Sequence, residues 1–243
     1  MILITRPKEQ SKSIEVSLNS KGYKTYLESL YKITYYKKKI SYNKKNYYIF
    51  PSINSVQSLI NSKQIHKFHE AKILAIGNKV KKALVKAGCK NIIIFSINSD
   101  ALLTEIIKPK FVNFNFVYLC SNIVNKDFLK KISQYKINLQ NIIIYKTIPS
   151  SKLDKKLVHN LELGNINGAI FLSKLSVETF IRLISKSKCL SVAKKINMYC
   201  LSDRVAVPLK LKKFKYIYIA TSPNESALVK SIKKSHFFNW SSN

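Results

Sequence analysis

The chain has 243 residues, a length that fits one large domain or two modest ones and excludes a peptide or a disulfide-stabilised miniprotein. Apolar residues make up 46% of it and aromatic residues 11%. This is enough apolar surface to offset chain entropy, so wholesale disorder is excluded as well. We therefore expect a globular protein with two domains.

The charge is strongly positive: 43 Lys and Arg stand against 12 Asp and Glu, giving a formal net charge of +31. Only Arg6, Arg182 and Arg204 are arginines. Proteins that read base edges or grip phosphates with a forked donor favour Arg, so this lysine excess argues against specific nucleic-acid binding as the main function. It predicts salt-dependent attraction of polycarboxylates, phosphates and other anions.

The cysteines, at positions 89, 120, 189 and 200, form no C-x-x-C pair and have no histidine at metal-ligand spacing. We expect buried, reduced thiols and no metal site. The chain opens directly on a strand-like run at 2–4 without a basic leader, and no apolar segment approaches the roughly 20 residues that span a bilayer. These features predict a cytoplasmic protein without a membrane partner.

Short apolar runs alternate with helical-period segments along almost the whole chain, which is typical of parallel sheets covered by helices. Polar residues able to cap a helix follow many of these runs, so one edge of each sheet should collect hydroxyls and backbone N–H groups. Ten predicted strands would make two sheets of five. They lie at 2–5, 24–28, 47–50, 73–76, 91–95, 116–120, 141–145, 168–172, 197–201 and 216–220.

An internal repeat supports two copies of one α/β unit. Residues 48–56 match residues 169–177 at an offset of 121, and both segments carry the pattern Ile-Phe-x-Ser-x-x-Ser-Val. Two such lobes on one chain commonly close around a ligand, because the carboxyl ends of the strands face the opening. The repeat alone is compatible with a simple division near residue 115.

Familiar catalytic motifs are missing. The five glycines cannot form G-x-G-x-x-G or G-x-x-x-x-G-K, and G-x-S-x-G does not occur. His66 and His69 are spaced i, i+3, but no third metal ligand is near them in the sequence. The residues by themselves therefore predict an anion-binding, two-lobed α/β protein, and no cofactor.

Several stretches, in order along the chain, resemble the uroporphyrinogen-III synthase family. The resemblance runs from residue 1 to about 232, and each motif alone is weak. The matching stretches are Ile4-Thr5-Arg6-Pro7, Phe50-Pro51-Ser52-Ile53-Asn54-Ser55-Val56, Ala75-Ile76-Gly77-Asn78, Leu119-Cys120-Ser121-Asn122, Ile144-Tyr145-Lys146-Thr147 and Ala220-Thr221-Ser222-Pro223-Asn224-Glu225.

The resemblance implies a particular division of the chain. Residues 1–33 with 150–243 would form one discontinuous lobe, and 36–147 the other, with linkers near 31–46 and 146–156. Each lobe would hold a parallel five-stranded sheet flanked by helices, and two strands would join the lobes across a cleft. The Lys- and Tyr-rich segment 31–46 can also be interpreted simply as a solvated linker.

The activity implied by the resemblance is the closure of hydroxymethylbilane, a linear tetrapyrrole with eight carboxylates, to uroporphyrinogen III. The last pyrrole ring, ring D, is inverted, water is lost and no cofactor is used. The substrate supplies most of the reactivity, so the protein contributes mainly proximity and modest acid assistance. We expect a monomer whose partner is this small molecule.

The resemblance also implies site residues. Tyr145 matches a tyrosine thought to assist departure of the hydroxyl, although it could simply be a strand-end tyrosine. Ser52 and Ser173, which the repeat relates, match substrate-contacting hydroxyls, and plain helix capping is an equally open interpretation. The further candidates for substrate binding are Thr5, Arg6, Asn54, Asn78, Ser121, Asn122 and Thr147.

One stretch departs from the family. Where Ile-Gly-Pro-Thr-Thr-Ala is common, this chain reads Leu-Ser-Asp-Arg-Val-Ala at 201–206, so Ser202 or Arg204 would have to replace the missing threonines. Pro208 is expected to interrupt the helix that follows. A noncatalytic two-lobed protein that binds an anionic metabolite is therefore the main alternative, and a nucleic-acid-binding protein is a third.

Overall fold

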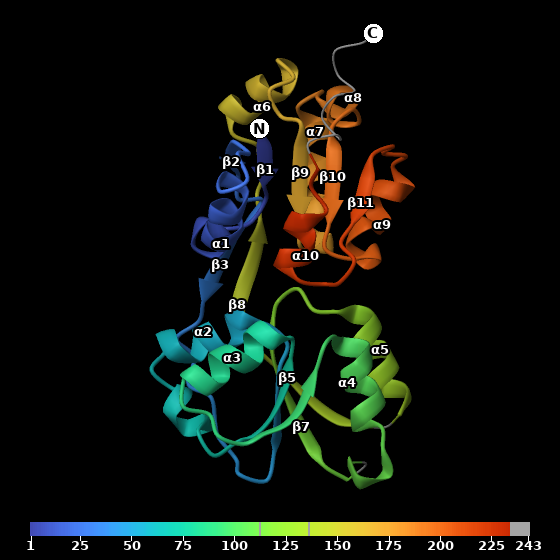
Figure 1. Cartoon of the computed structure of the whole chain (residues 1–243). Coiled ribbons are helices and arrows are strands. Elements are labelled where there is room, and N and C mark those ends of the chain that lie inside the picture. Colours follow the sequence, from blue (N-terminus) through green and yellow to red (C-terminus); the bar gives the residue numbers. More distant parts are fainter. Residues whose placement is uncertain (112, 136, 234–243) are drawn as a thin grey trace. The chain divides into compact units, whose positions relative to one another are not determined.

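The structure is a computed structural model that describes residues 1–111, 113–135 and 137–233. The chain divides into two compact units. Unit 1 comprises Met1–Lys32 and the chain from Ile148 onward, and unit 2 comprises Ile33–Thr147. The chain passes between the units twice, within strand β3 (Tyr31–Tyr35) and within strand β8 (Asn138–Pro149) (Figure 1).

Unit 1 is built on a five-stranded parallel sheet, as the sequence predicted. The order of its strands is β11-β10-β9-β1-β2. All neighbouring strands run in the same direction, so their carboxyl ends share one edge. The strands are β1 (Ile2–Ile4), β2 (Thr25–Leu27), β9 (Gly168–Phe171), β10 (Asn197–Cys200) and β11 (Ile217–Ile219).

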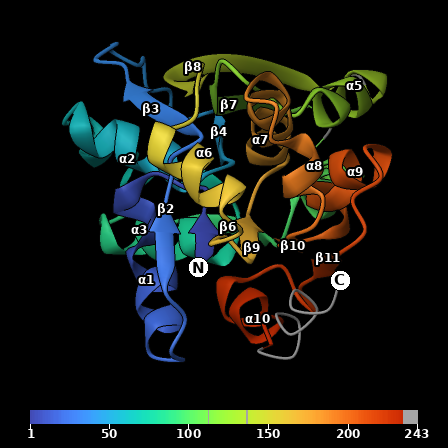
Figure 2. The same cartoon turned by 90° about the horizontal axis from the view of Figure 1, so that it is seen from above.

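Helices cover both faces of this sheet (Figure 2). On one face α1 and α10 enclose a core around Ile4, Tyr199 and Leu228. On the other face α6, α7, α8 and α9 enclose a core around Leu3, Phe171 and Phe180. The helices are α1 (Lys8–Asn19), α6 (Lys155–Glu162), α7 (Lys174–Lys186), α8 (Leu190–Ala193), α9 (Asp203–Leu211) and α10 (Glu225–Lys230).

Unit 2 holds a six-stranded sheet, where the sequence predicted five strands. Its order is β3-β8-β7-β4-β5-β6, and β4 to β8 are parallel. The additional strand, β3, was interpreted as part of a solvated linker. Its alternation of Tyr31, Ile33 and Tyr35 with polar residues is the period-two pattern of a half-buried edge strand. The other strands are β4 (Tyr47–Phe50), β5 (Lys72–Ile76), β6 (Ile92–Ser96) and β7 (Asn115–Ser121).

The sheet of unit 2 also has two covered faces (Figure 1). On one face α2 and α3 pack over Tyr48, Phe50 and Ile73, and on the other α4 and α5 pack over Ile49 and Tyr118. The helices are α2 (Ile53–Asn61), α3 (Asn78–Lys86), α4 (Ser99–Ile106) and α5 (Lys126–Gln134), with short 3-10 helices η1 (Ile65–Phe68) and η2 (Pro109–Phe111).

The sequence repeat corresponds to a repeat of topology. Strands β8-β7-β4-β5-β6 of unit 2 lie in the same spatial order as β2-β1-β9-β10-β11 of unit 1. The repeated segments fall on β4 with α2 and on β9 with α7, each with a serine, Ser52 or Ser173, as N-cap. Because unit 1 begins with the pair equivalent to β7 and β8, it is a circular permutation of unit 2.

The helix after β10 corrects one prediction. Helix α9 continues through Pro208 to Leu211 and is not interrupted there. A proline inside a helix removes the bond to the carbonyl four residues earlier, which here belongs to Arg204, and its ring crowds that carbonyl. Since Arg204 is exposed, water can satisfy that carbonyl and the helix persists.

Candidate functional site

Each unit has a topological switch point, where neighbouring strands send their following helices to opposite faces. In unit 1, α1 follows β1 onto one face and α7 follows β9 onto the other. In unit 2, α2 follows β4 and α5 follows β7 in the same manner. Doubly wound sheets bind ligands at the carboxyl edge beside such points. The candidate site residues follow these strands or their neighbours.

Tyr145 lies on β8 in unit 2, paired with Ser121 at the end of β7. Its side chain is only 5% exposed. Burial raises the pKa of Tyr145 to about 12, and hydrogen bonding with Ser52 and Ser55 opposes part of that rise. The phenol is therefore protonated at neutral pH and can act as a hydrogen-bond donor.

The start of α2 holds the groups around that phenol in place. Ser52 caps the helix, its Oγ accepting from the backbone N of Asn54 at 3.2 Å. The Oδ1 of Asn54 accepts from the Tyr35 hydroxyl at 3.2 Å. Ser55 donates to the carbonyl of Leu119 on β7 at 2.8 Å, which ties α2 across the switch point. These bonds fix both serines relative to Tyr145.

A second cluster joins the ends of β7 and β8. The hydroxyls of Ser121 and Thr147 lie 3.0 Å apart. The Oδ1 of Asn122 accepts from the backbone N of Thr147 at 2.8 Å and from the Ser121 hydroxyl at 2.9 Å. Ser121 and Thr147 are buried, and Asn122 is exposed. Asn78 is also exposed, as the first residue of α3 after Gly77.

In unit 1, two of the predicted site residues use their side chains to bond to other residues of the protein. Thr5 is fully buried and donates to the carbonyl of Ile170 on β9 at 2.7 Å. Arg6 forms an ion pair of 2.7 Å with Glu225 of α10. These bonds join the end of β1 to the strand and the helix beside it.

The other predicted residues of unit 1 begin helices. Ser173 caps α7, its Oγ accepting from the backbone N of Ser176 at 3.2 Å. Ser202 is the N-cap of α9 without a side-chain cap bond, and Arg204 is exposed in the first turn. Both helices follow strands of the parallel sheet, so these residues lie at its carboxyl edge.

The sequence did not single out three residues that belong to these networks: Ser55, Tyr35 and Glu225. For Ser55 a signal existed, because the repeat aligns it with Ser176, and both serines begin a helix after a strand end. Tyr35 lay in the segment interpreted as a linker. Glu225 carried no local signal, because its partner is at the other end of the chain.

Metal and thiol chemistry find little support. Over residues 1–111, 113–135 and 137–233, no three His, Cys, Asp or Glu side chains come together as a metal site would require. All four cysteines are buried and unpaired. Burial raises the pKa of Cys89 and of Cys120 to about 11, so these groups are thiols at neutral pH. Among the described helices, none is long and apolar enough to cross a membrane.

The chain contains two permuted copies of one doubly wound unit, and each copy has hydroxyl and amide groups beside its switch point. These features define a two-domain α/β protein of the class that binds ligands at the carboxyl edges of its sheets. The sequence matches the family model described as uroporphyrinogen-III synthase HemD over residues 12–230. The chain therefore belongs to the uroporphyrinogen-III synthase family. No curated protein matches it in sequence.

Solved structures show the same fold. The uroporphyrinogen-III synthetase of Helicobacter pylori aligns with a TM-score of 0.63 at 16% identity, covering 94% of this chain and 96% of that one. A mutant uroporphyrinogen III synthase of Thermus thermophilus aligns with a TM-score of 0.61 at 13% identity, covering 95% and 96%. As a member of the family matched over residues 12–230, the chain is a lyase-type enzyme of haem biosynthesis that acts on a small-molecule tetrapyrrole.

Proposed function

We propose that the substrate is hydroxymethylbilane and that the chain converts it to uroporphyrinogen III with inversion of ring D and loss of water. The pyrrole nitrogen of the ring that carries the hydroxymethyl group, at the opposite end of the linear tetrapyrrole from ring D, expels the hydroxyl, which takes up a proton and leaves as water. The substituted carbon of ring D attacks the resulting azafulvene to give a spiro intermediate. The bond from the spiro carbon to its original bridging carbon then breaks and leaves a second azafulvene on ring C. The unsubstituted α-carbon of ring D attacks that azafulvene and loses its proton, which balances the proton taken up by the hydroxyl and leaves ring D inverted.

In this proposal Tyr145 assists departure of the hydroxyl. The observation that supports it is the burial of this phenol beside the β4/β7 switch point, hydrogen-bonded to Ser52 and Ser55. With a pKa of about 12 the phenol is protonated at neutral pH, so it can hydrogen-bond to the leaving oxygen as that oxygen gains negative charge. The proton then moves toward that oxygen in the transition state, which is modest general-acid assistance.

The other site residues fall into two groups, those that contact the substrate and those that support the strand ends. Side chains with some exposure would donate hydrogen bonds to the substrate's carboxylates. Side chains whose hydroxyls bond to neighbouring strand ends, Thr5, Ser121 and Thr147, would hold those strand ends in place. The proposed substrate contacts are Ser52, Asn54, Asn78, Asn122, Ser173, Ser202 and Arg204, aided by helix N-termini and by surplus lysines.

We propose further that the protein is a cytoplasmic monomer without a specific nucleic-acid partner. The scarcity of arginine supports the last point. Sedimentation at several concentrations should give a single mass near one chain. Any association with duplex DNA should vanish at physiological salt. The central test of the function is the isomer composition of the product formed from hydroxymethylbilane.

A further inference from the structure

The ion pair between Arg6 and Glu225 is unusual for this chain, because acidic residues are scarce and this one is mostly buried. The two side chains are only 15% and 16% exposed. The ion pair of Lys90 with Glu70, by contrast, lies in solvent, with side chains 75% and 70% exposed. A mostly buried charge pair holds its two elements together, since removing one partner leaves the other charge uncompensated.

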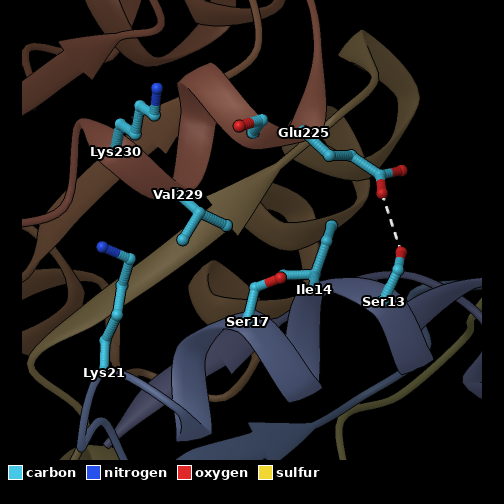
Figure 3. Close-up of a pocket in the computed structure, with 8 residues that line it drawn as sticks. Ser13, Ile14, Ser17, Lys21, Glu225, Val229 and Lys230 are labelled. Carbon is cyan, nitrogen blue, oxygen red and sulfur yellow. Dashed lines mark hydrogen bonds between the residues drawn. The ribbon is translucent and has the colours of Figure 1, made fainter.

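Further bonds extend this pair into a junction of several elements. The second Glu225 oxygen accepts from Ser13 of α1 at 2.9 Å (Figure 3). Arg6 also donates to the side chain of Gln10 at 3.1 Å and hydrogen-bonds to the phenol of Tyr31. The junction therefore links the end of β1, α1, the start of β3 and the first residue of α10.

The packing of α10 beside α1 leaves a groove of about 320 Å³ between the two helices (Figure 3). Glu225 and Ser13 meet at one end of this groove, and Lys21 and Lys230 line the other. Two ammonium groups on facing elements repel one another, so the electrostatic attraction at this groove comes from the Glu225 end, beside the apolar contact of Ile14 with Val229.

The segment 221–224 precedes Glu225 and crosses the carboxyl edge of the sheet. It begins after β11, at one side of the order β11-β10-β9-β1-β2, and leads to the residue bound to Arg6 at the end of β1. Three strand spacings amount to roughly 14 Å, so the segment must lie across the ends of β10 and β9. Thr221, Ser222 and Asn224 on it are exposed.

The segment also has internal order. The Nδ2 of Asn224 donates to the Ser222 hydroxyl at 2.7 Å, and its Oδ1 accepts from the backbone N of Ala227 at 2.9 Å. Asn224 thus caps α10 and shapes the segment before it. The position of the segment over the sheet depends on its anchors to unit 1: the buried Leu228 and Val229 of α10 pack in the core, and the Arg6–Glu225 pair ties the first residue of α10 to the end of β1.

We propose that Arg6 and Glu225 are positioning residues, and that the segment 221–224 which they hold is a substrate-binding loop of unit 1. Thr221 and Ser222 on this loop offer hydroxyls to the carboxylates of the tetrapyrrole. This inference rests on the proposed function for the identity of the ligand. It gives Arg6 a different role from direct substrate contact, because its two terminal nitrogens bond to Glu225 and Gln10. The Nε of Arg6 is buried and has no hydrogen-bond partner within the described part of the chain.

The positioning role is tested without substrate by hydrogen exchange. Glu225→Gln keeps the shape of the side chain and loses its charge, so amides in 222–228 should exchange at least about tenfold faster, the loss of one charge-assisted bond. The matched control is Glu70→Gln, which removes an exposed pair in unit 2 and should leave those amides unchanged. Unchanged exchange in Glu225→Gln overturns the positioning role.

The binding role is tested with hydroxymethylbilane on the wild-type protein and the double variant Thr221→Ala with Ser222→Ala. Both side chains are exposed, so the variant should fold normally. We expect KM to rise about tenfold with kcat reduced less than threefold, as lost ground-state binding predicts. An unchanged KM overturns the loop's role. A wild-type protein that forms no type III isomer overturns the proposed function instead, and the exchange experiment still decides the positioning role.

Discussion

The phenol of Tyr145 on β8 and the hydroxyl of Ser52 at the start of α2 are hydrogen-bonded across the sheet of unit 2, although the two residues are far apart in the sequence. In the order of that sheet, β8 is followed by β7 and then by β4, the strand that leads into α2. The start of α2 therefore lies close to β8. The protonated phenol of Tyr145 is therefore held by residues at the start of a helix. Substitutions at Tyr145 and Ser52 can separate the role of the phenol as a proton donor from its role in packing.

Replacing Tyr145 by Phe should lower kcat by up to about 10²-fold with little change in KM, because general-acid assistance acts only in the transition state. The control is Tyr47→Phe, a buried tyrosine at the amino end of β4. Steady-state kinetics of both variants provide the comparison. Equal kcat values for Tyr145→Phe and the wild-type protein would remove the phenol from the mechanism.

The raised pKa of Tyr145 makes a prediction about alkaline pH. The folded protein keeps this proton to about pH 12, whereas the unfolded chain loses it near pH 10. The resulting stability is fully present below pH 10 and is lost between pH 10 and pH 12, at roughly 1.4 kcal/mol per pH unit. Denaturant titrations of the wild-type protein and Tyr145→Phe should diverge over this interval. Parallel curves would show an ordinary phenol.

The two repeat-related serines allow their two roles to be separated. Ser52→Ala and Ser173→Ala each remove an N-cap, so each should lower the free energy of unfolding by about 1 kcal/mol. Ser52 also bonds to Tyr145, so only its loss should reduce kcat substantially. Unfolding curves and kinetics of both variants test this. Equal losses of kcat would show that both serines act through helix capping or both through substrate contact.

The net charge of +31 should speed capture of a substrate with eight carboxylates. Raising the salt concentration should therefore lower kcat/KM several-fold and leave kcat nearly constant, because screening acts on association. A salt series with sodium chloride provides the measurement. If kcat/KM does not respond, the lysines do not contribute to capture.

Much of the fold follows from local patterns, because each strand has its own apolar run between capping residues. All ten predicted strands are present, and the repeat around Ser52 and Ser173 marks equivalent positions in both sheets. Strand β3 was not predicted because it begins the Lys- and Tyr-rich segment 31–46, whose composition favours a linker. Helix α9 continues through Pro208 although the bond to the Arg204 carbonyl is lost.

The site was harder to predict, because its bonds join distant segments. Thr5 matches a substrate-binding position, yet its hydroxyl donates to the carbonyl of Ile170 on a neighbouring strand. Arg6 matches a substrate-binding position, yet it bonds to Glu225 from the far end of the chain. Neither partner has a sequence signature, since pairing of this kind depends on which strands become neighbours.

The most direct measurement is the isomer composition of the uroporphyrinogen formed when the purified protein receives freshly made hydroxymethylbilane. The type III isomer should predominate and its yield should increase with protein concentration, and Tyr145→Phe should lower the rate. A product that contains only the type I isomer, which forms spontaneously, would contradict the account.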